Sequence, residues 1–90
     1  MIVYIKTQSG VSLIEKGEIL TIGGFDNCHI LTGNNKNELE LIGKYPNNEI
    51  AIKMFNELIL RIINPSDSEI KRGAMYIDLK VLEEVVGGIE

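Results

Sequence analysis

The stretch that decides the fold is Asn47–Ile63, with the sequence NNEIAIKMFNELILRII. Pro46 ends the strand expected before it, Asn47 or Asn48 can cap a helix, and Glu49 places a negative charge in the first turn. At 100° per residue, one narrow face collects apolar side chains and three isoleucines widen its flank. The face consists of Ala51, Met54, Phe55, Leu58 and Ile62, and the flank of Ile52, Ile59 and Ile63. The pattern predicts one long amphipathic helix whose apolar face covers the core.

Five short apolar runs, separated by glycine and asparagine turns, precede this helix and indicate β-strands. The break at Gly17 is either a bulge within one bent strand or a turn between two strands. Because every connection is short, we expect an antiparallel β-meander of four to five strands packed on the long helix. The predicted strands are Ile2–Thr7, Val11–Ile14, Glu18–Ile22, Cys28–Thr32 and Glu38–Tyr45.

The segment after the long helix predicts a helical turn and a short strand. Ser66 and Glu69 have the spacing of a capping box, so we expect one helical turn there, which Gly73 ends. Met75–Ile77 is apolar and aromatic, and it predicts a short strand at a sheet edge.

A short helix closes the sequence. Asp78 is a suitable N-cap and Gly87 a suitable C′ residue, so we expect a helix over Leu79–Val86. Ninety residues are too few for two independent cores. The prediction is therefore a single α+β domain over residues 1–90, with a C-terminal short strand and short helix.

The composition narrows the function classes. A net charge of −4 disfavours nucleic acid as the main partner, because phosphate binding needs concentrated lysine and arginine. The single cysteine excludes an intrachain disulfide. No apolar run approaches the roughly 18 residues of a membrane span, and residues 1–6 lack the features of a signal peptide. We therefore expect a cytoplasmic protein with no membrane partner.

The chain also resembles a group of small uncharacterised proteins from low-GC Gram-positive bacteria and their prophages. The resemblance rests on Lys6–Gly10 (KTQSG), on Leu41–Tyr45 (LIGKY) and on the start of the long helix. The pattern of the group is LGxY-x3-E-x-A, and here Ile42 stands at its leucine position. It covers about residues 1–60. The helix residues that carry it are Glu49, Ala51, Phe55, Glu57 and Leu58. The resemblance implies a phage or mobile-element origin and no known activity.

Residues with catalytic chemistry are few. Cys28 and His29 are the only cysteine and the only histidine, and neighbours on a strand point to opposite faces, so they do not form a nucleophile–base pair. Glu38 and Glu40 share a strand face about 7 Å apart, but alternating charges of this kind typically form a solvated face. The sequence predicts no catalytic, cofactor-binding or metal-binding residue and no cofactor.

The main functional hint is a surplus of apolar surface. The apolar arc of the long helix covers about half its circumference, more than one small sheet can cover, and Leu60 lies outside that arc. The short C-terminal helix can cover part of the surplus within the chain, between chains, or both. Leu60 favours association, so we expect a homodimer. We expect the tail Met75–Val86 and the outer flank of the long helix at or near the interface. The interface candidates are Ile52, Ile59, Leu60, Ile63, Leu79, Leu82, Val85 and Val86.

Three function classes follow, in order of preference. The first is a small non-catalytic protein-interaction module that self-associates and contacts a host or phage protein. The second is a nucleic-acid-associated regulator, which requires lysines to converge on one face against the overall charge. The third is a small enzyme with an unrecognised site. The lysines concerned are Lys6, Lys16, Lys44 and Lys53.

Overall fold

The computed structural model of the chain describes residues 2–8, 10–14, 19–33, 35 and 37–87. These residues form an α+β fold, as the sequence predicts. In chain order the elements are β1 (Ile2–Lys6), β2 (Val11–Ile14), β3 (Ile19–Gly23), the 3-10 turn η1 (Phe25–Asn27), β4 (His29–Gly33), β5 (Leu39–Lys44), α1 (Asn48–Ile63), α2 (Asp67–Arg72), β6 (Ala74–Asp78) and α3 (Leu79–Val86).

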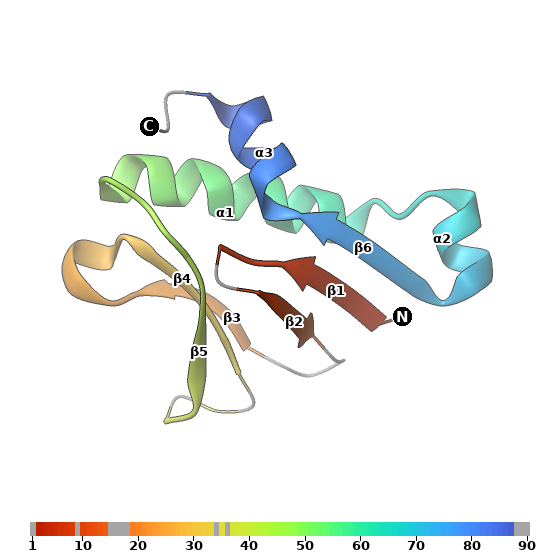
Figure 1. Cartoon of the computed structure of the whole chain (residues 1–90), viewed down its shortest axis with the longest axis horizontal. Coiled ribbons are helices and arrows are strands. Elements are labelled where there is room, and N and C mark those ends of the chain that lie inside the picture. The colour runs from red at the N-terminus through yellow and green to blue at the C-terminus, as the bar shows by residue number, and fades with distance from the viewer. Residues whose placement is uncertain (1, 9, 15–18, 34, 36, 88–90) are drawn as a thin grey trace.

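The strands form two three-stranded sheets (Figure 1). β3, β4 and β5 follow one another in an antiparallel meander, with an irregularity in register between Ile30 and Leu31. In the other sheet, β1 lies between β2, which is antiparallel to it, and β6, which is parallel to it. The predicted meander of four to five strands is therefore wrong, because the first two strands belong to a separate sheet. The bulge or turn at Gly17 lies outside the described residues.

Burial explains why β1 occupies the centre of its sheet. Val3 and Ile5 are buried, and their register partners on β6, Met75 and Ile77, are buried beside them. Pairing β1 with β6 thus joins two inward-facing apolar pairs, which stabilises the sheet through burial of nonpolar surface. Short connections along the chain indicate which strands pair locally, but they carry no information about this distant pairing.

α1 agrees with the prediction to within one residue. The Asn47 side chain caps it by accepting a hydrogen bond from the Ile50 amide at 2.9 Å. Ala51, Met54 and Leu58 have no exposed surface, whereas Phe55 and Ile62 pack at the margin of the core. The core joins side chains of both sheets to this face of α1. Its buried members are Val3, Ile5, Ile30, Ile42, Tyr45, Ala51, Met54, Leu58, Met75, Ile77 and Leu79.

The C-terminal elements also form as predicted. The capping box of α2 is complete, since Ser66 and Glu69 bond each other's backbone amides. Gly73 ends the helix with a φ of 69°, a left-handed conformation that suits glycine. Asp78 caps α3 by accepting a hydrogen bond from the Lys80 amide. α3 packs on α1 of the same chain (Figure 1).

One side chain connects the two sheets with α3. The Gln8 side chain accepts a hydrogen bond from the Lys44 amide at 2.7 Å and donates to the Lys44 carbonyl oxygen at 3.1 Å. The same Gln8 amide group donates to the Glu83 carboxylate at 2.9 Å. Gln8 therefore ties the end of β1 to β5 and to α3.

Candidate interaction surface

Exposed apolar side chains occur on α1, α3 and β6. Leu60 on α1 is 51% exposed, Tyr76 on β6 is 63% exposed, and Val81 and Val85 on α3 are 55% and 67% exposed. Val81 and Val85 are four residues apart, so they share one side of α3. Such residues are common singly on a protein surface, but a group rimmed by polar residues is typical of a contact surface.

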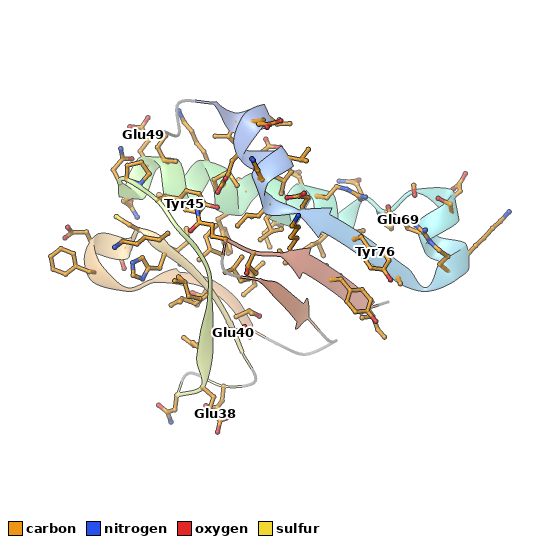
Figure 2. All side chains as sticks on the ribbon, viewed as in Figure 1. Glu38, Glu40, Tyr45, Glu49, Glu69 and Tyr76 are labelled. Carbon is orange, nitrogen blue, oxygen red and sulfur yellow. The ribbon has the colours of Figure 1, made fainter. Side chains whose placement is uncertain are left out.

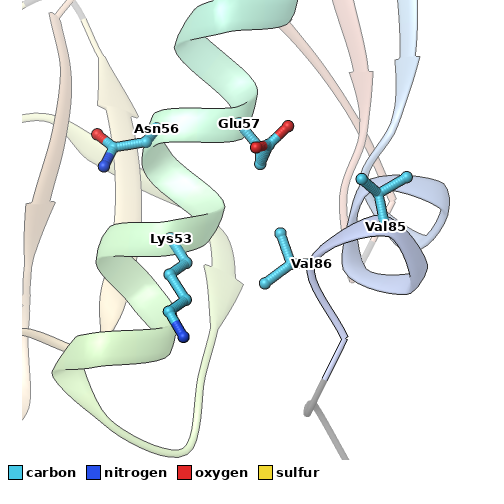
Figure 3. Close-up of a pocket in the computed structure, with 5 residues that line it drawn as sticks. All are labelled: Lys53, Asn56, Glu57, Val85 and Val86. Atoms are coloured by element: carbon cyan, nitrogen blue, oxygen red, sulfur yellow. The ribbon is translucent and has the colours of Figure 1, made fainter.

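A groove runs between α1 and α3. One part of it is a hollow of about 380 Å³, lined on α1 by Lys53, Asn56 and Glu57 and on α3 by Val85 and Val86 (Figure 3). The next part, about 260 Å³, lies beside β6 and α3. We call the two parts together the α1–α3 groove. The second part is lined by Arg61, Tyr76, Ile77, Asp78, Val81 and Leu82.

Leu60 belongs to the same side of α1 as the groove. At 100° per residue it falls between Lys53 and Asn56 around the helix axis. The exposed apolar side chain therefore projects among the polar residues that line one wall of the groove. The groove is therefore apolar on its α3 side and polar or charged on its α1 side. Leu60 is an apolar residue on the α1 side.

The β6 end of the groove is held by an ion pair. Arg61 Nη2 donates to Glu69 Oε2 at 2.6 Å, and its other terminal nitrogen lies 3.7 Å from the sulfur of Met75. Glu69 is only 4% exposed, and its second oxygen accepts a hydrogen bond from the Ser66 amide at 2.8 Å. Arg61, followed by the Ser66 amide, lowers the pKa of Glu69 to about 2. The guanidinium is thereby fixed at the floor of the groove.

Two tyrosines cover the outer face of β1 and β6. Tyr4 and Tyr76 are register partners, and their rings stack with centroids 4.8 Å apart and an interplanar angle of 9°. Tyr76 and Glu69 lie toward the same end of the molecule (Figure 2). The outer face of this sheet thus presents an aromatic pair next to an open strand edge.

The structure divides the predicted interface residues into three groups. Leu60, Ile63 and Val85 are more than half exposed, and Ile52 is 42% exposed. Ile59, Leu82 and Val86 are half-buried. Leu79 is 1% exposed and belongs to the core of a single chain, so it has no surface to offer a partner.

Tyr76 and Val81 lie in the tail Met75–Val86 that the sequence places at or near the interface, although neither is among the individual candidates. Tyr76 alternates with the inward-facing Met75 and Ile77, and this period of two is the signal that identifies it as an outward-facing side chain. Val81 lies just outside the inner face of α3, and the helical period of the sequence already predicts this position.

Cys28 and His29 line another hollow of about 380 Å³, together with Phe25, Asp26, Lys44, Tyr45 and Pro46. Cys28 is 8% exposed, and its sulfur lies 3.4 Å from the Asp26 carbonyl oxygen, which fits a weak S–H···O hydrogen bond. Cys28 precedes β4, rather than beginning it as predicted. Among the residues that the structure describes, no group of three or more His, Cys, Asp and Glu side chains could hold a metal ion.

Tyr45 is the most unusual polar residue of the core. It is 3% exposed, and within the described part of the chain its hydroxyl group has no hydrogen-bond partner. Burial, followed by the negative charge of Glu83, raises the pKa of the Tyr45 phenol well above its ordinary value. The Tyr45 phenol is therefore neutral at physiological pH.

The glutamates considered for catalysis and the lysines considered for nucleic-acid binding do not form a common site among the described residues. Glu38 and Glu40 are exposed near one end of β5 (Figure 2). Lys6, Lys44 and Lys53 line three different hollows, and Lys16 lies outside the described residues.

Comparisons with protein-family models, with curated proteins and with solved structures find no match to this chain. Within the described ranges, no helix combines the length and the apolar character that crossing a membrane requires. The functional argument therefore rests on the surface itself.

Proposed function

We propose that the chain is a small, non-catalytic protein-interaction module that self-associates through the exposed side of α1, α3 and β6. The observation that carries the proposal is the exposure of Leu60, Tyr76, Val81 and Val85, each more than half exposed. Tyr76 and Val81 line one hollow together. Covering this group removes apolar side chains from water, which is the main driving force of protein association. Closed twofold pairing is the commonest way for a small domain to achieve this.

The polar surroundings also support an interaction surface. Lys53, Glu57 and Arg61 form a charged wall beside the apolar residues, and charged rims around apolar centres are typical of protein interfaces. The proposed partner is a second copy of the chain, and a host or phage protein is a further partner in the same proposal.

Light scattering coupled to size exclusion tests the self-association. At low micromolar concentration we expect a mass of about 20 kDa, twice the 10.0 kDa of one chain. Leu60→Glu and Val85→Asp should shift the mass toward one chain, because each places a charge on the covered surface. Phe25→Glu is the matched control, since Phe25 is 83% exposed and belongs to η1 rather than to α1, α3 or β6. A wild type of about 10 kDa would overturn the proposal.

A further inference from the structure

β6 is an open edge of its sheet. It pairs with β1 on one side, and no described strand lies on its other side. The Ile2 amide donates to the Gly73 carbonyl oxygen at 3.0 Å, and Ile2 is the register partner of Ala74. In a parallel ladder this pattern alternates along the strand, so Gly73, Met75 and Ile77 direct their backbone groups toward β1. The amide and carbonyl groups of Ala74 and Tyr76 point away from the sheet.

This edge lacks the devices that usually prevent strand pairing. Natural edge strands are protected by lysine, proline or bulges. β6 has the sequence AMYID, contains neither lysine nor proline, and keeps an unbroken register with β1. The second part of the α1–α3 groove runs beside it, bordered by the exposed side chain of Val81. The edge is therefore available to a further strand.

We propose that β6 pairs antiparallel with β6 of a second copy about a twofold axis at Tyr76, which joins the two three-stranded sheets into one sheet of six strands. This inference rests on the proposed self-association and names its mode. With the axis at Tyr76, Tyr76 faces its own copy, and Ala74 faces Asp78 of the other chain. Tyr76 has outward backbone groups in both copies, so the register satisfies antiparallel geometry at the axis, and the two Tyr76 residues exchange two hydrogen bonds. The Tyr4–Tyr76 stacks of the two copies then lie side by side on one face.

The charges next to β6 favour a second copy over an unrelated extended peptide. α2 precedes β6 and α3 follows it, so antiparallel pairing brings α2 of one copy beside α3 of the other (Figure 1). α2 ends with the basic pair Lys71 and Arg72, and it exposes Ile70. α3 exposes Val81 and the acidic Glu84. Each chain thus carries both halves of a complementary contact, apolar with apolar and basic with acidic.

Substitutions at Tyr76 test the edge itself. Tyr76→Lys adds the charge that natural edges use against pairing, and Tyr76→Pro removes the outward amide, at a position where an edge strand tolerates proline. Both variants should keep the circular dichroism spectrum of the wild type and have the mass of one chain. Phe25→Lys, which also replaces an exposed aromatic residue, should remain dimeric. Dimeric Tyr76→Lys and Tyr76→Pro would overturn the β6 pairing and leave self-association intact, whereas a monomeric wild type would overturn both.

Hydrogen exchange reports the pairing without any substitution. In the wild type, the Tyr76 amide should exchange at least about tenfold more slowly when the protein concentration is raised through the dimerisation range. The Ile77 amide, which faces β1, should show no comparable change. A Tyr76 amide that exchanges equally fast at all concentrations in a dimeric sample would contradict the proposal.

Charge reversal tests the identity of the partner strand. Lys71→Glu combined with Arg72→Glu, and separately Glu84→Lys, should each weaken self-association, because like charges then meet in both symmetry-related contacts. An equimolar mixture of the two variants should restore a dimer, since every contact in the mixed pair is again between opposite charges. A mixture that stays monomeric while the wild type is dimeric would contradict the antiparallel register.

Discussion

The two sheets have the same number of strands but different construction. β3, β4 and β5 are consecutive in the chain and pair through short turns. The other sheet joins β1 to β6, at opposite ends of the sequence, and has α1 and α2 between them. One sheet is therefore encoded locally, and the other depends on tertiary packing.

This difference shows where the fold is vulnerable. β1 and β2 alone are a two-stranded hairpin, which is marginally stable in water. They acquire a third strand only when β6 packs beside β1 and buries Met75 and Ile77. The N-terminal sheet thus depends on α1 and the C-terminal elements for its third strand, whereas β3–β5 pair with their neighbours in sequence.

The largest expected effect comes from removing core side chains in either sheet. Ile5 lies in the first sheet and Ile30 in the second, and both have no exposed surface. Replacing either with alanine should reduce the free energy of unfolding by about 2–5 kcal/mol in urea denaturation. Ile63→Ala, at an exposed position on α1, should change it by less than about 1 kcal/mol.

The same denaturation curves show whether the sheets share one core. Because side chains of both sheets meet on α1, each variant should unfold in a single transition, with the same midpoint by fluorescence and by circular dichroism. Two separated transitions would mean that the sheets unfold independently.

A smaller effect is expected where Gln8 connects the sheets. Gln8→Ala removes its hydrogen bonds to the Lys44 backbone and to Glu83 and should lower the free energy of unfolding by about 1 kcal/mol. Asn64→Ala is the control, because Asn64 donates one exposed hydrogen bond to Leu60 within a helix end. If Gln8→Ala and Asn64→Ala lose the same free energy of unfolding, the hydrogen bonds of Gln8 between the sheets contribute no more than one exposed hydrogen bond.

The smallest effect is the contribution of Glu69, which lies just before β6, to the pH dependence of stability. The pKa of Glu69 is about 2 in the folded protein, below its value of about 4.3 in an unfolded chain. The ionised carboxylate therefore stabilises the fold fully above about pH 4.3, and this contribution is lost as the pH falls toward about 2. The difference in melting temperature between the wild type and Glu69→Gln should narrow over that range. If the melting temperatures of the two proteins change in parallel with pH, the low pKa of Glu69 is contradicted.

The locally encoded elements could be predicted from the sequence. Asn47 as the cap of α1, the capping box of Ser66 and Glu69, and Asp78 as the cap of α3 are all read from neighbouring residues, and the structure confirms them. The sequence also places β6 at a sheet edge. The parallel pairing of β1 with β6 could not be predicted, because strand composition does not specify which distant strand is the neighbour.

The candidate surface was only partly visible in the sequence. Leu60 stands out because it lies outside the apolar arc of the long helix, and it is exposed. Val85 lies beside the apolar face of the short helix in the sequence pattern, and it is exposed as well. The role of Leu79 in the core of its own chain depends on how α3 meets α1, which periodicity does not specify. The open edge of β6 depends on the sheet topology, so Tyr76 could be recognised only after the strand order was known.

The position of β1 has a consequence during synthesis. β1 is translated before its parallel neighbour β6, which follows α2 in the chain. At roughly 5–20 residues per second, the ribosome needs several seconds to make the segment between them. During that time Val3 and Ile5 lack the partners that bury them in the finished protein. The nascent chain therefore has an incomplete apolar sheet until β6 has been made.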